Sequence, residues 1–390
     1  PRVNGTSLSA RTFAAAAHNT RYASKLRCCY NTISTTGYSV RPREIPPFPG
    51  YTAGAINGRR ETQMDTAPDA PPLEPRPGFA TRGVVITPPD LTLDWPERAR
   101  RAGLTTIALH PFPRNVTEFV QSHDGELFLD TCRELGLHVE YELHAMADLL
   151  PRALFDKHPD FFRMNDEGQR VPDANLCVHS TGALEHVTAN AVRVARVLRP
   201  STGRYYFWGD DGLPWCRCPK CRAFSDSDQA LLLENVLVRA LTAFDERAQL
   251  AHLAYVNTLP PPGSVTPEPR VFLEFAPIHR KFDVPLNHPG SIENKNHLDL
   301  LDANLKVFPA ETAQVLEYWL DCSLFSKWKE PHVKLPWAEA VLNADLAEYG
   351  SRGIRHITTF AVYLDAHYLT AHGEPPIASY GQALAQWRPR

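Results

Sequence analysis

This sequence lacks several features that would place it in the commonest classes of protein. No apolar run approaches the ~18 residues that a membrane-spanning helix needs, so no membrane partner is predicted. The formal net charge is only −3, which argues against a nucleic acid or an acidic membrane surface as a partner. The chain has no P-loop, and no G-x-G-x-x-G follows its first expected strand, so the common nucleotide-binding folds are disfavoured.

Acidic residues are missing from the beginning of the chain. Residues 1–43 contain no Asp or Glu, and residues 42–77 are rich in proline with little apolar periodicity. Such segments bury too little apolar surface to offset the entropy of ordering them. We therefore expect residues 1–76 to be a disordered leader and residues 77–390 to form the folded domain. The acid-poor start also resembles a transit peptide, so a targeting or tethering role is the alternative.

Cysteine is too sparse for a disulfide scaffold, with 8 residues in 390, but three of the cysteines are clustered. Cys216, Cys218 and Cys221 have C-x-C-x-x-C spacing, which allows three thiols to converge on one soft metal ion. Thiols that bind metal must stay reduced, so a cytoplasmic protein is expected. The alternative is that they are free thiols in a loop.

From Pro77 onward, short β-branched or aromatic segments alternate with helical segments. The expected strands are Arg82–Thr87, Thr105–His110, His138–Met146, Tyr205–Asp210, Leu250–Asn257, Val271–Pro277, Gln314–Asp321 and His356–Tyr363. The expected helices are Pro96–Ala102, Glu126–Leu135, Gly182–Val197, Ser227–Glu246, Leu298–Asn304, Trp337–Tyr349 and Ile377–Trp387. Eight such units in about three hundred residues predict a (β/α)8 TIM barrel, and an open doubly wound sheet is the rival.

Polar and aromatic residues gather at the carboxyl ends of these strands, where barrel enzymes keep their active residues. On the third strand, Glu140, Glu142 and His144 alternate with apolar residues, so the polar set should point into the barrel. Glu140 can equally be a buried structural residue. The expected substrate-binding residues are His110, Glu142, His144, Trp208, Tyr255, Asn257, Arg280, Trp319, Tyr363 and Asp365.

Several short elements together resemble one known family. They are Leu150-Pro151-Arg152, His158-Pro159, Phe161-Phe162, Asp166–Arg170, Leu176-Cys177, Asp211-Gly212, Trp215-Cys216-x-Cys218-x-x-Cys221 and Leu253-Ala254-Tyr255 leading to Pro260-Pro261. This pattern, over roughly residues 80–365, resembles the TIM-barrel family filed as domain of unknown function 4838. The relatives of that family include glycoside hydrolase family 163, the endo-β-N-acetylglucosaminidases. The resemblance implies a glycosidase-like barrel.

The resemblance also bears on the metal site, because three cysteines need a fourth ligand to close a tetrahedral zinc site. Cys177 is the best candidate, since it belongs to the family element and precedes strand four. His179 is the second candidate. A closed site of Cys177, Cys216, Cys218 and Cys221 would hold a structural zinc ion, because catalytic zinc keeps one position open.

Two arrangements of carboxylates are possible for a glycosidase, which needs one group to protonate the leaving oxygen and another to stabilise or attack the anomeric carbon. In the first, Asp210 and Asp211 act together: one polarises a 2-acetamido group so that its carbonyl attacks, and the other protonates the leaving group. In the second, a strand-four carboxylate is the acid/base and Glu317 on strand seven is the nucleophile, with Glu274 available for either role. Asp211 should be the more sensitive of the adjacent pair, because Gly212 lets the loop turn this carboxylate into the mouth. The alternative without function is an Asx turn at the strand end.

The leading hypothesis is therefore a glycoside hydrolase that acts on a glycan, with a 2-acetamido sugar as the expected substrate. The aromatic residues near the strand ends support it, because their faces stack on the C–H faces of sugar rings. A non-catalytic carbohydrate-binding barrel with a structural zinc site is the second hypothesis. A metalloenzyme that uses the cysteine site directly is the third.

Overall fold

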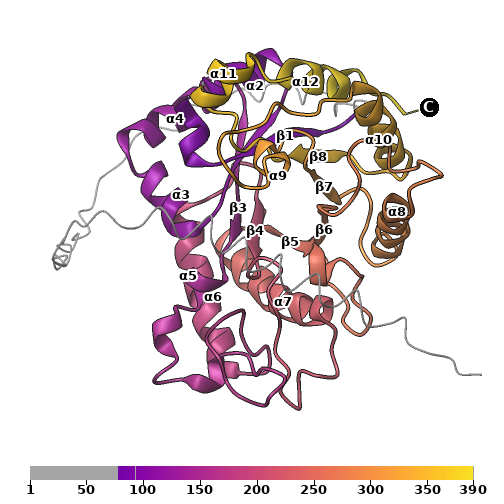
Figure 1. The fold of residues 1–390 in the computed structure, drawn as a ribbon. Coiled ribbons are helices and arrows are strands. Elements are labelled where there is room, and N and C mark those ends of the chain that lie inside the picture. Colours follow the sequence, from indigo (N-terminus) through magenta and orange to yellow (C-terminus); the bar gives the residue numbers. More distant parts are fainter. Residues whose placement is uncertain (1–77, 93, 390) are drawn as a thin grey trace, which may run out of the picture.

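The computed structural model describes residues 78–92 and 94–389, so the expected leader at residues 1–76 lies outside the described residues. Eight parallel strands close into a barrel in the order β1 to β8, and the helices lie around its outside (Figure 1). The predicted (β/α)8 barrel is confirmed. The closed order excludes the open doubly wound sheet.

The elements follow the chain as alternating strands and helices. The strands are β1 (Thr81–Ile86), β2 (Thr106–Leu109), β3 (His138–His144), β4 (Arg204–Trp208), β5 (Gln249–Ala254), β6 (Val271–Phe275), β7 (Gln314–Glu317) and β8 (His356–Thr359). The α-helices are α2 (Trp95–Arg101), α3 (Pro113–Val120), α4 (His123–Glu134), α5 (Met146–Leu149), α6 (Thr181–Val197), α7 (Asp226–Phe244), α8 (Ile292–Asn304), α9 (Cys322–Phe325), α10 (Glu339–Ser351), α11 (Ala366–His372) and α12 (Ile377–Gln386). Short 3-10 turns are η1 (Pro88–Thr92), η2 (Arg152–Leu154), η3 (Pro159–Phe161) and η4 (Val256–Thr258). In the described part of the chain, no helix is long and apolar enough to cross a membrane.

All eight expected strands are present, but their carboxyl ends come earlier than the sequence indicated. β7 ends at Glu317 instead of Asp321, and β8 ends at Thr359 instead of Tyr363. The residues beyond these ends leave the ladder and build the loops of the barrel mouth. Four α-helices in these loops, α3, α5, α9 and α11, were not expected from the apolar pattern.

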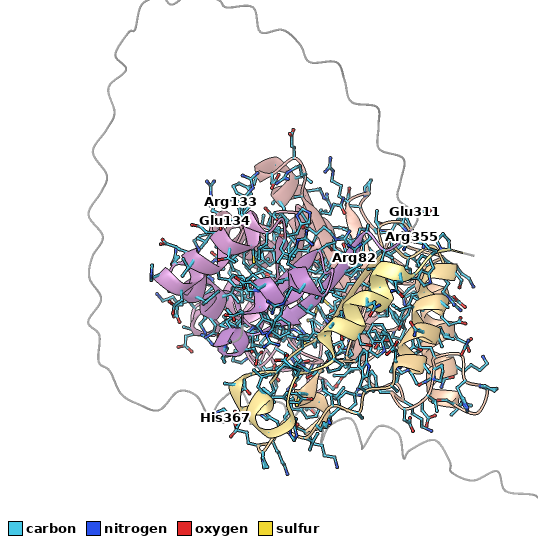
Figure 2. All side chains as sticks on the ribbon, turned by 90° about the horizontal axis from the view of Figure 1, so that it is seen from above. Arg82, Arg133, Glu134, Glu311, Arg355 and His367 are labelled. Atoms are coloured by element: carbon cyan, nitrogen blue, oxygen red, sulfur yellow. The ribbon has the colours of Figure 1, made fainter. Side chains whose placement is uncertain are left out.

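The two faces of the barrel are distinct. One face carries the starts of the strands, and Arg82, Glu311 and Arg355, at or just before strand starts, gather toward it (Figure 2). His367 in α11 lies at the opposite edge. The face on the side of His367 is formed by the loops that follow the strands. In this fold, active residues lie at that carboxyl-terminal face.

The interior of the barrel follows the alternation expected for β3. Glu140 and Glu142 point inward, where Glu140 accepts hydrogen bonds from Thr202 and Tyr206 and Glu142 accepts one from Gln314. The residues between them belong to the apolar layer that packs the sheet against the helices. The lower interior of this barrel therefore contains a layer of buried polar groups beside an apolar cluster that includes Ala108, Ala251 and Phe272.

A hydrogen-bond network crosses this polar layer. The Nε2 group of Gln314 donates to Oε1 of Glu142 at 3.2 Å and to Oε1 of Glu274 at 3.0 Å. Oε2 of Glu274 accepts from the indole N–H of Trp208 at 2.8 Å. Burial raises the pKa of Glu274 to about 8, although the hydrogen bond from Trp208 opposes the shift. Burial and the charge of Glu274 likewise raise the pKa of Glu142 well above its ordinary value.

The raised pKa of Glu274 predicts how stability depends on pH. The folded protein binds a proton at Glu274 that the unfolded chain releases near its ordinary pKa of 4.5, so the free energy of unfolding should fall as the pH rises from 5 to 8. In Glu274→Gln this fall should be smaller by at least ~1.4 kcal/mol, the equivalent of one pKa unit. Urea unfolding at several pH values measures it. If the free energy of unfolding changes with pH in the same way in wild type and Glu274→Gln, the raised pKa of Glu274 is contradicted.

Candidate active site

A pocket of about 260 Å³ lies at the carboxyl-terminal mouth of the barrel. Its lining comes from the ends of every strand except β1, so it is centred on the barrel axis. Of the residues expected from the sequence, it contains His110, His144, Trp208, Tyr255 and the adjacent pair Asp210 and Asp211. The structure thus brings these six together. Whether they act on a substrate stays a prediction.

Two histidines line the pocket side by side, with ring centroids 5.7 Å apart. Nδ1 of His110 lies 2.7 Å from the carbonyl oxygen of Glu142, and Nδ1 of His144 lies 2.8 Å from the carbonyl oxygen of Gly209. Because a carbonyl only accepts, both Nδ1 atoms carry the hydrogen. Burial, with a smaller contribution from His144, lowers the pKa of His110 to about 3, so His110 is neutral and its Nε2 is an acceptor.

The adjacent aspartates have different environments. Asp210 forms an ion pair with Arg152, accepts the backbone N–H of Asn175 at 2.5 Å, and donates its own N–H to Oδ1 of Asn175 at 2.9 Å. In contrast, Oδ1 of Asp211 is buried without a hydrogen-bond partner among the described residues and lies 3.8 Å from Nε2 of His144. Asp210 therefore anchors the loop, and Asp211 is the member of the pair available for chemistry.

Glu317, expected as a nucleophile, lies outside the pocket. On β7, Gln314 and Leu316 face the barrel interior, so Glu317 faces the helices. Its Oε1 accepts from Arg280 at 2.7 Å and from the hydroxyl of Tyr349 at 2.5 Å.

The same outward-facing cluster includes two expected substrate-binding residues. Arg280 also donates to Asp345 at 2.7 Å, and the indole of Trp319 donates to Asp345 at 3.2 Å. The side chains of Arg280, Glu317 and Asp345 are fully buried. The geometry therefore assigns Arg280 and Trp319, like Glu317, to a structural ion cluster.

Four other expected residues lie near the pocket without lining it. Glu142 and Glu274 lie beneath it in the polar layer, where Glu274 supports Trp208. Asn257 borders a small adjoining recess and donates to Asp226 at 2.7 Å. Asp365 caps α11 by accepting the N–H of Tyr368 at 3.0 Å.

Tyr363 also lies beyond the pocket lining. Its ring stacks on His332 with centroids 4.4 Å apart, and its N–H donates to Asp90 at 3.0 Å. Asp90 is buried, and burial raises its pKa to about 7. These contacts fix the loop after β8 at the rim of the mouth.

The pocket also contains a carboxylate that the sequence places at the end of the seventh strand without indicating a catalytic or binding role. Asp321 follows β7, and its Oδ1 accepts from the hydroxyl of Ser323 at 2.5 Å and the N–H of Leu324 at 3.1 Å. Burial raises the pKa of Asp321 to about 6. The signal in the sequence is Asp321-Cys322-Ser323, which is a typical start of a helix.

Tyr318 lines the pocket together with the two candidate acids, Asp211 and Asp321. Burial raises its pKa well above the ordinary value, and the charges of Asp321 and Asp211 add to the shift. Asp211 and Asp321 line the same pocket as Tyr318, and they come from the ends of β4 and β7. Trp328 was also not expected there, and it completes the aromatic lining.

Backbone strain is concentrated around this mouth. Among the described residues other than glycine, positive φ angles occur at Asn175, Val256, Lys327, Trp328 and Tyr363. Each such conformation costs on the order of 1–3 kcal/mol and persists only where its surroundings enforce it. Asn175 holds Asp210, Val256 follows Tyr255, and Trp328 lines the pocket. Strain located in this way is typical of a functional site.

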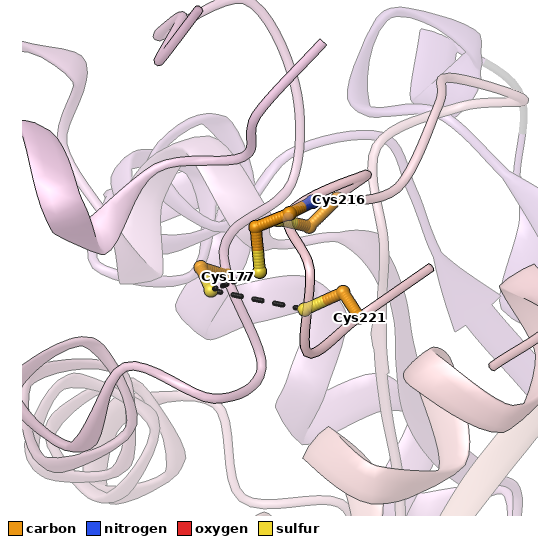
Figure 3. A group of neighbouring side chains, drawn as sticks. Cys177, Cys216 and Cys221 are labelled. Atoms are coloured by element: carbon orange, nitrogen blue, oxygen red, sulfur yellow. Dashed lines mark hydrogen bonds between the residues drawn. The ribbon is translucent and has the colours of Figure 1, made fainter. Parts of the chain in front are cut away.

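The four cysteines expected as metal ligands meet beside the mouth. The Sγ atoms of Cys177, Cys216, Cys218 and Cys221 are all within 4.8 Å of one another, and all four residues are buried. Figure 3 shows the side chains of Cys177, Cys216 and Cys221 pointing toward one another. Sγ of Cys177 lies 3.8 Å from Sγ of Cys218 and 3.8 Å from Sγ of Cys221. A tetrahedron with Zn–S bonds of ~2.3 Å has edges of about 3.8 Å, so the cluster has the dimensions of a four-thiolate metal site.

The surroundings of the cluster also fit a metal–thiolate centre. Sγ of Cys216 faces the backbone N–H of Met164 at 3.3 Å and the guanidinium of Arg170 at 3.7 Å, and such donors stabilise thiolates. His179 contacts Sγ of Cys221 through Nδ1 at 3.2 Å, so it is placed as a neighbour of a ligand. The cluster joins the loop before α6 to the loop after β4, which carries Asp211.

The closed barrel with a pocket at its carboxyl-terminal mouth defines the protein as a (β/α)8 barrel of the kind that many enzymes share. The chain belongs to the family described as domain of unknown function DUF4838, whose model matches residues 108–318. No curated protein matches it. The relation to glycoside hydrolase family 163 stays a prediction.

Several solved structures are similar in fold. A β-galactosidase from the psychrophilic Marinomonas ef1 has 13% identity and a TM-score of 0.49, over 78% of this chain and 59% of that chain. PbGH5A, a glycoside hydrolase family 5 enzyme from Prevotella bryantii B14, has 10% identity and a TM-score of 0.42, over 79% and 98%. The endo-β-1,4-glucanase Xac0029 from Xanthomonas axonopodis pv. citri has 9% identity and a TM-score of 0.42, over 78% and 98%. The chain spans 59% of the length of the Marinomonas enzyme.

The cysteine cluster predicts a metal content that can be measured. Protein purified without added metal should contain ~1 zinc ion per chain, because four thiolates complete a tetrahedral site. Cys216→Ser should lose the metal and unfold at a temperature several degrees lower. Cys132→Ser, which alters a buried thiol on α4 outside the cluster, is the matched control and should keep the metal. Metal-free wild type would contradict the site.

The buried ion cluster predicts that Glu317 matters for stability. Glu317→Gln should lower the free energy of unfolding by ~2–4 kcal/mol, because Arg280 keeps its charge in the interior with one carboxylate fewer. Glu311→Gln, at an exposed position before β7, is the control and should be neutral. Urea unfolding provides the measurement. An unfolding curve like that of wild type would show that the cluster does not need this charge.

Proposed function

We propose that the protein is a glycoside hydrolase whose two carboxylates are Asp211 and Asp321. The observation that carries the proposal is that both line one pocket, to which they come from the carboxyl ends of two different strands, β4 and β7. Glycosidases of most families need such a pair on either side of the scissile bond. Asp211 is proposed as the acid that protonates the leaving oxygen.

Asp321 is proposed as the second carboxylate. With a pKa of about 6 it is ionised at neutral pH, and it can then stabilise or attack the anomeric carbon, or activate water. It takes the strand-seven role that the sequence suggested for Glu317. Its hydrogen bonds from Ser323 and Leu324 fix the orientation of the carboxylate, as a group that must meet a developing positive charge requires.

The proposed substrate is a glycan that places one sugar ring in the pocket. The volume of about 260 Å³ is slightly below the ~300 Å³ at which pockets for drug-sized ligands begin, which suits a single ring. Trp208, Tyr255 and Trp328 supply aromatic surface for the apolar face of a sugar.

A 2-acetamido sugar is the proposed occupant, as the family resemblance implies. The neutral His110 offers Nε2 as an acceptor for the amide N–H, and Leu253 and Leu316 offer apolar contacts for the methyl group. The scheme in which Asp210 polarises the acetamido group has less support, because Asp210 already pairs with Arg152 and Asn175.

For the cysteine cluster we propose structural zinc. Cys177, Cys216, Cys218 and Cys221 would hold the ion and fix the loop that carries Asp211. Four thiolates leave no open coordination position, so direct metal catalysis at this site has no support.

Amide variants of the two acids test the proposal. Asp211→Asn should lower kcat/KM on a natural glycan by ~10²–10⁴-fold, the usual contribution of general-acid assistance, and should lower it less on 4-nitrophenyl glycosides, whose leaving group needs no proton. Asp321→Asn should be equally damaging on both substrates. Glu311→Gln is the control. If the wild type binds glycans without cleaving any of them, the protein is a carbohydrate-binding barrel instead.

A further inference from the structure

We propose that His144 and Asp211 hold one proton between them and act together as the general acid, so that His144 belongs to the proton-transfer machinery. The catalytic part of this inference rests on the proposed function, but the shared proton follows from the geometry of the pocket. The sequence suggested only a substrate-binding role for His144.

The hydrogen bond of Nδ1 determines which ring nitrogen of His144 carries the hydrogen. Nδ1 lies 2.8 Å from the carbonyl oxygen of Gly209. A carbonyl cannot donate, so Nδ1 must carry the hydrogen in any stable arrangement. In the neutral imidazole, Nε2 then has a lone pair and no hydrogen.

Nε2 of His144 faces the carboxylate of Asp211. It lies 3.8 Å from Oδ1 of Asp211, an atom that is buried and has no hydrogen-bond partner among the described residues. If both groups lacked a proton, a lone pair would face a carboxylate oxygen in a partly desolvated site, which is unfavourable. One proton placed on either atom turns this repulsion into a charge-assisted hydrogen bond. The separation exceeds hydrogen-bonding distance, as is common for catalytic pairs before substrate binds.

The charged and titratable groups around His144 and Asp211 do not compete for this proton. His110, on β2, is neutral and donates to the carbonyl of Glu142, so it cannot share the proton through Nδ1. Asp210, on the loop after β4, is neutralised by Arg152. Arg114 is exposed at the rim of the pocket. Asp321 lies at the end of β7, where Ser323 and Leu324 hold its Oδ1.

The consequence for catalysis is a supply of protons at neutral pH. An isolated aspartic acid, with a pKa of ~3.9, is almost fully ionised at pH 7 and is a poor acid catalyst there. A pair that shares one proton can still donate that proton to the leaving oxygen at pH 7. The proton passes to the glycosidic oxygen while the bond from that oxygen to the anomeric carbon breaks, and the oxygen keeps the electron pair. Water then supplies hydroxide to the anomeric carbon, and the proton of that water returns to the pair.

The shared proton can be tested without any substrate. In full-length protein labelled with ¹⁵N-histidine, the Nε2 chemical shift of His144 at pH 6.5 should indicate partial protonation. In Asp211→Asn it should move to the range of an unprotonated ring nitrogen. His110→Gln verifies the assignment of the neighbouring ring. If the Nε2 shift of His144 is the same in wild type and Asp211→Asn, the two residues do not share a proton and the inference is overturned.

Kinetics tests the catalytic part. In His144→Gln the alkaline limb of the pH–rate profile should move to lower pH, and the loss of kcat/KM should be larger for a natural glycan than for a 4-nitrophenyl glycoside. A rise in KM with an unchanged pH profile would mean that His144 only binds sugar. If wild type cleaves no glycan, the proposed function fails, while the NMR experiment still decides whether the proton is shared.

Discussion

The ion pair between Asp210 and Arg152 determines how the mouth of this barrel is organised. It is reinforced by Asn175, which accepts from the N–H of Asp210 and donates its own N–H to the carboxylate. Arg152 and Asn175 belong to the long excursion after β3, so the pair fastens that excursion to the end of β4. Because Arg152 and Asn175 hold Asp210, its neighbour Asp211 is directed toward His144 and the pocket. The cysteine cluster secures the same two loops from the outer side.

Burial of charge separates the carboxylates of the helix layer and the barrel interior from those on the pocket wall. Glu317 and Asp345 share the guanidinium of Arg280 in the helix layer, where an unpaired charge would be costly. Glu142 and Glu274 lie inside the barrel, where burial favours their protonated forms. Among the described residues, the carboxylates on the pocket wall are those of Asp211, Asp321 and the anchored Asp210.

The fold and the cysteine cluster could be predicted because their signals are local. The alternation of strands and helices predicts the barrel, and the C-x-C-x-x-C spacing predicts that three of the four cysteines meet. The orientation of β7 could not be predicted. Val315, Leu316, Tyr318 and Trp319 are all apolar or aromatic, so no alternation reveals which face Glu317 occupies.

Contacts between residues far apart in the chain also could not be predicted from the sequence. The partners Arg152 and Asp210 are separated by 58 residues, and nothing near either of them indicates the other. Arg280 meets Glu317 and Asp345 through the same kind of distant contact. For this reason the sequence did not show that Arg280, Trp319 and Glu317 belong to one buried ion cluster. Asp321 was recognised at the end of the seventh expected strand but received no catalytic role, and it caps the start of α9.

The central claim is that the pocket between Asp211 and Asp321 hydrolyses a glycosidic bond. The most direct test is to incubate the protein with a mixture of glycans that contain 2-acetamido sugars in H₂¹⁸O and to analyse the products by mass spectrometry. We expect shortened glycans with one ¹⁸O atom at each new reducing end, formed ~10²–10⁴-fold more slowly with Asp211→Asn. Glycans recovered intact and free of ¹⁸O, from a protein that binds them, would contradict it.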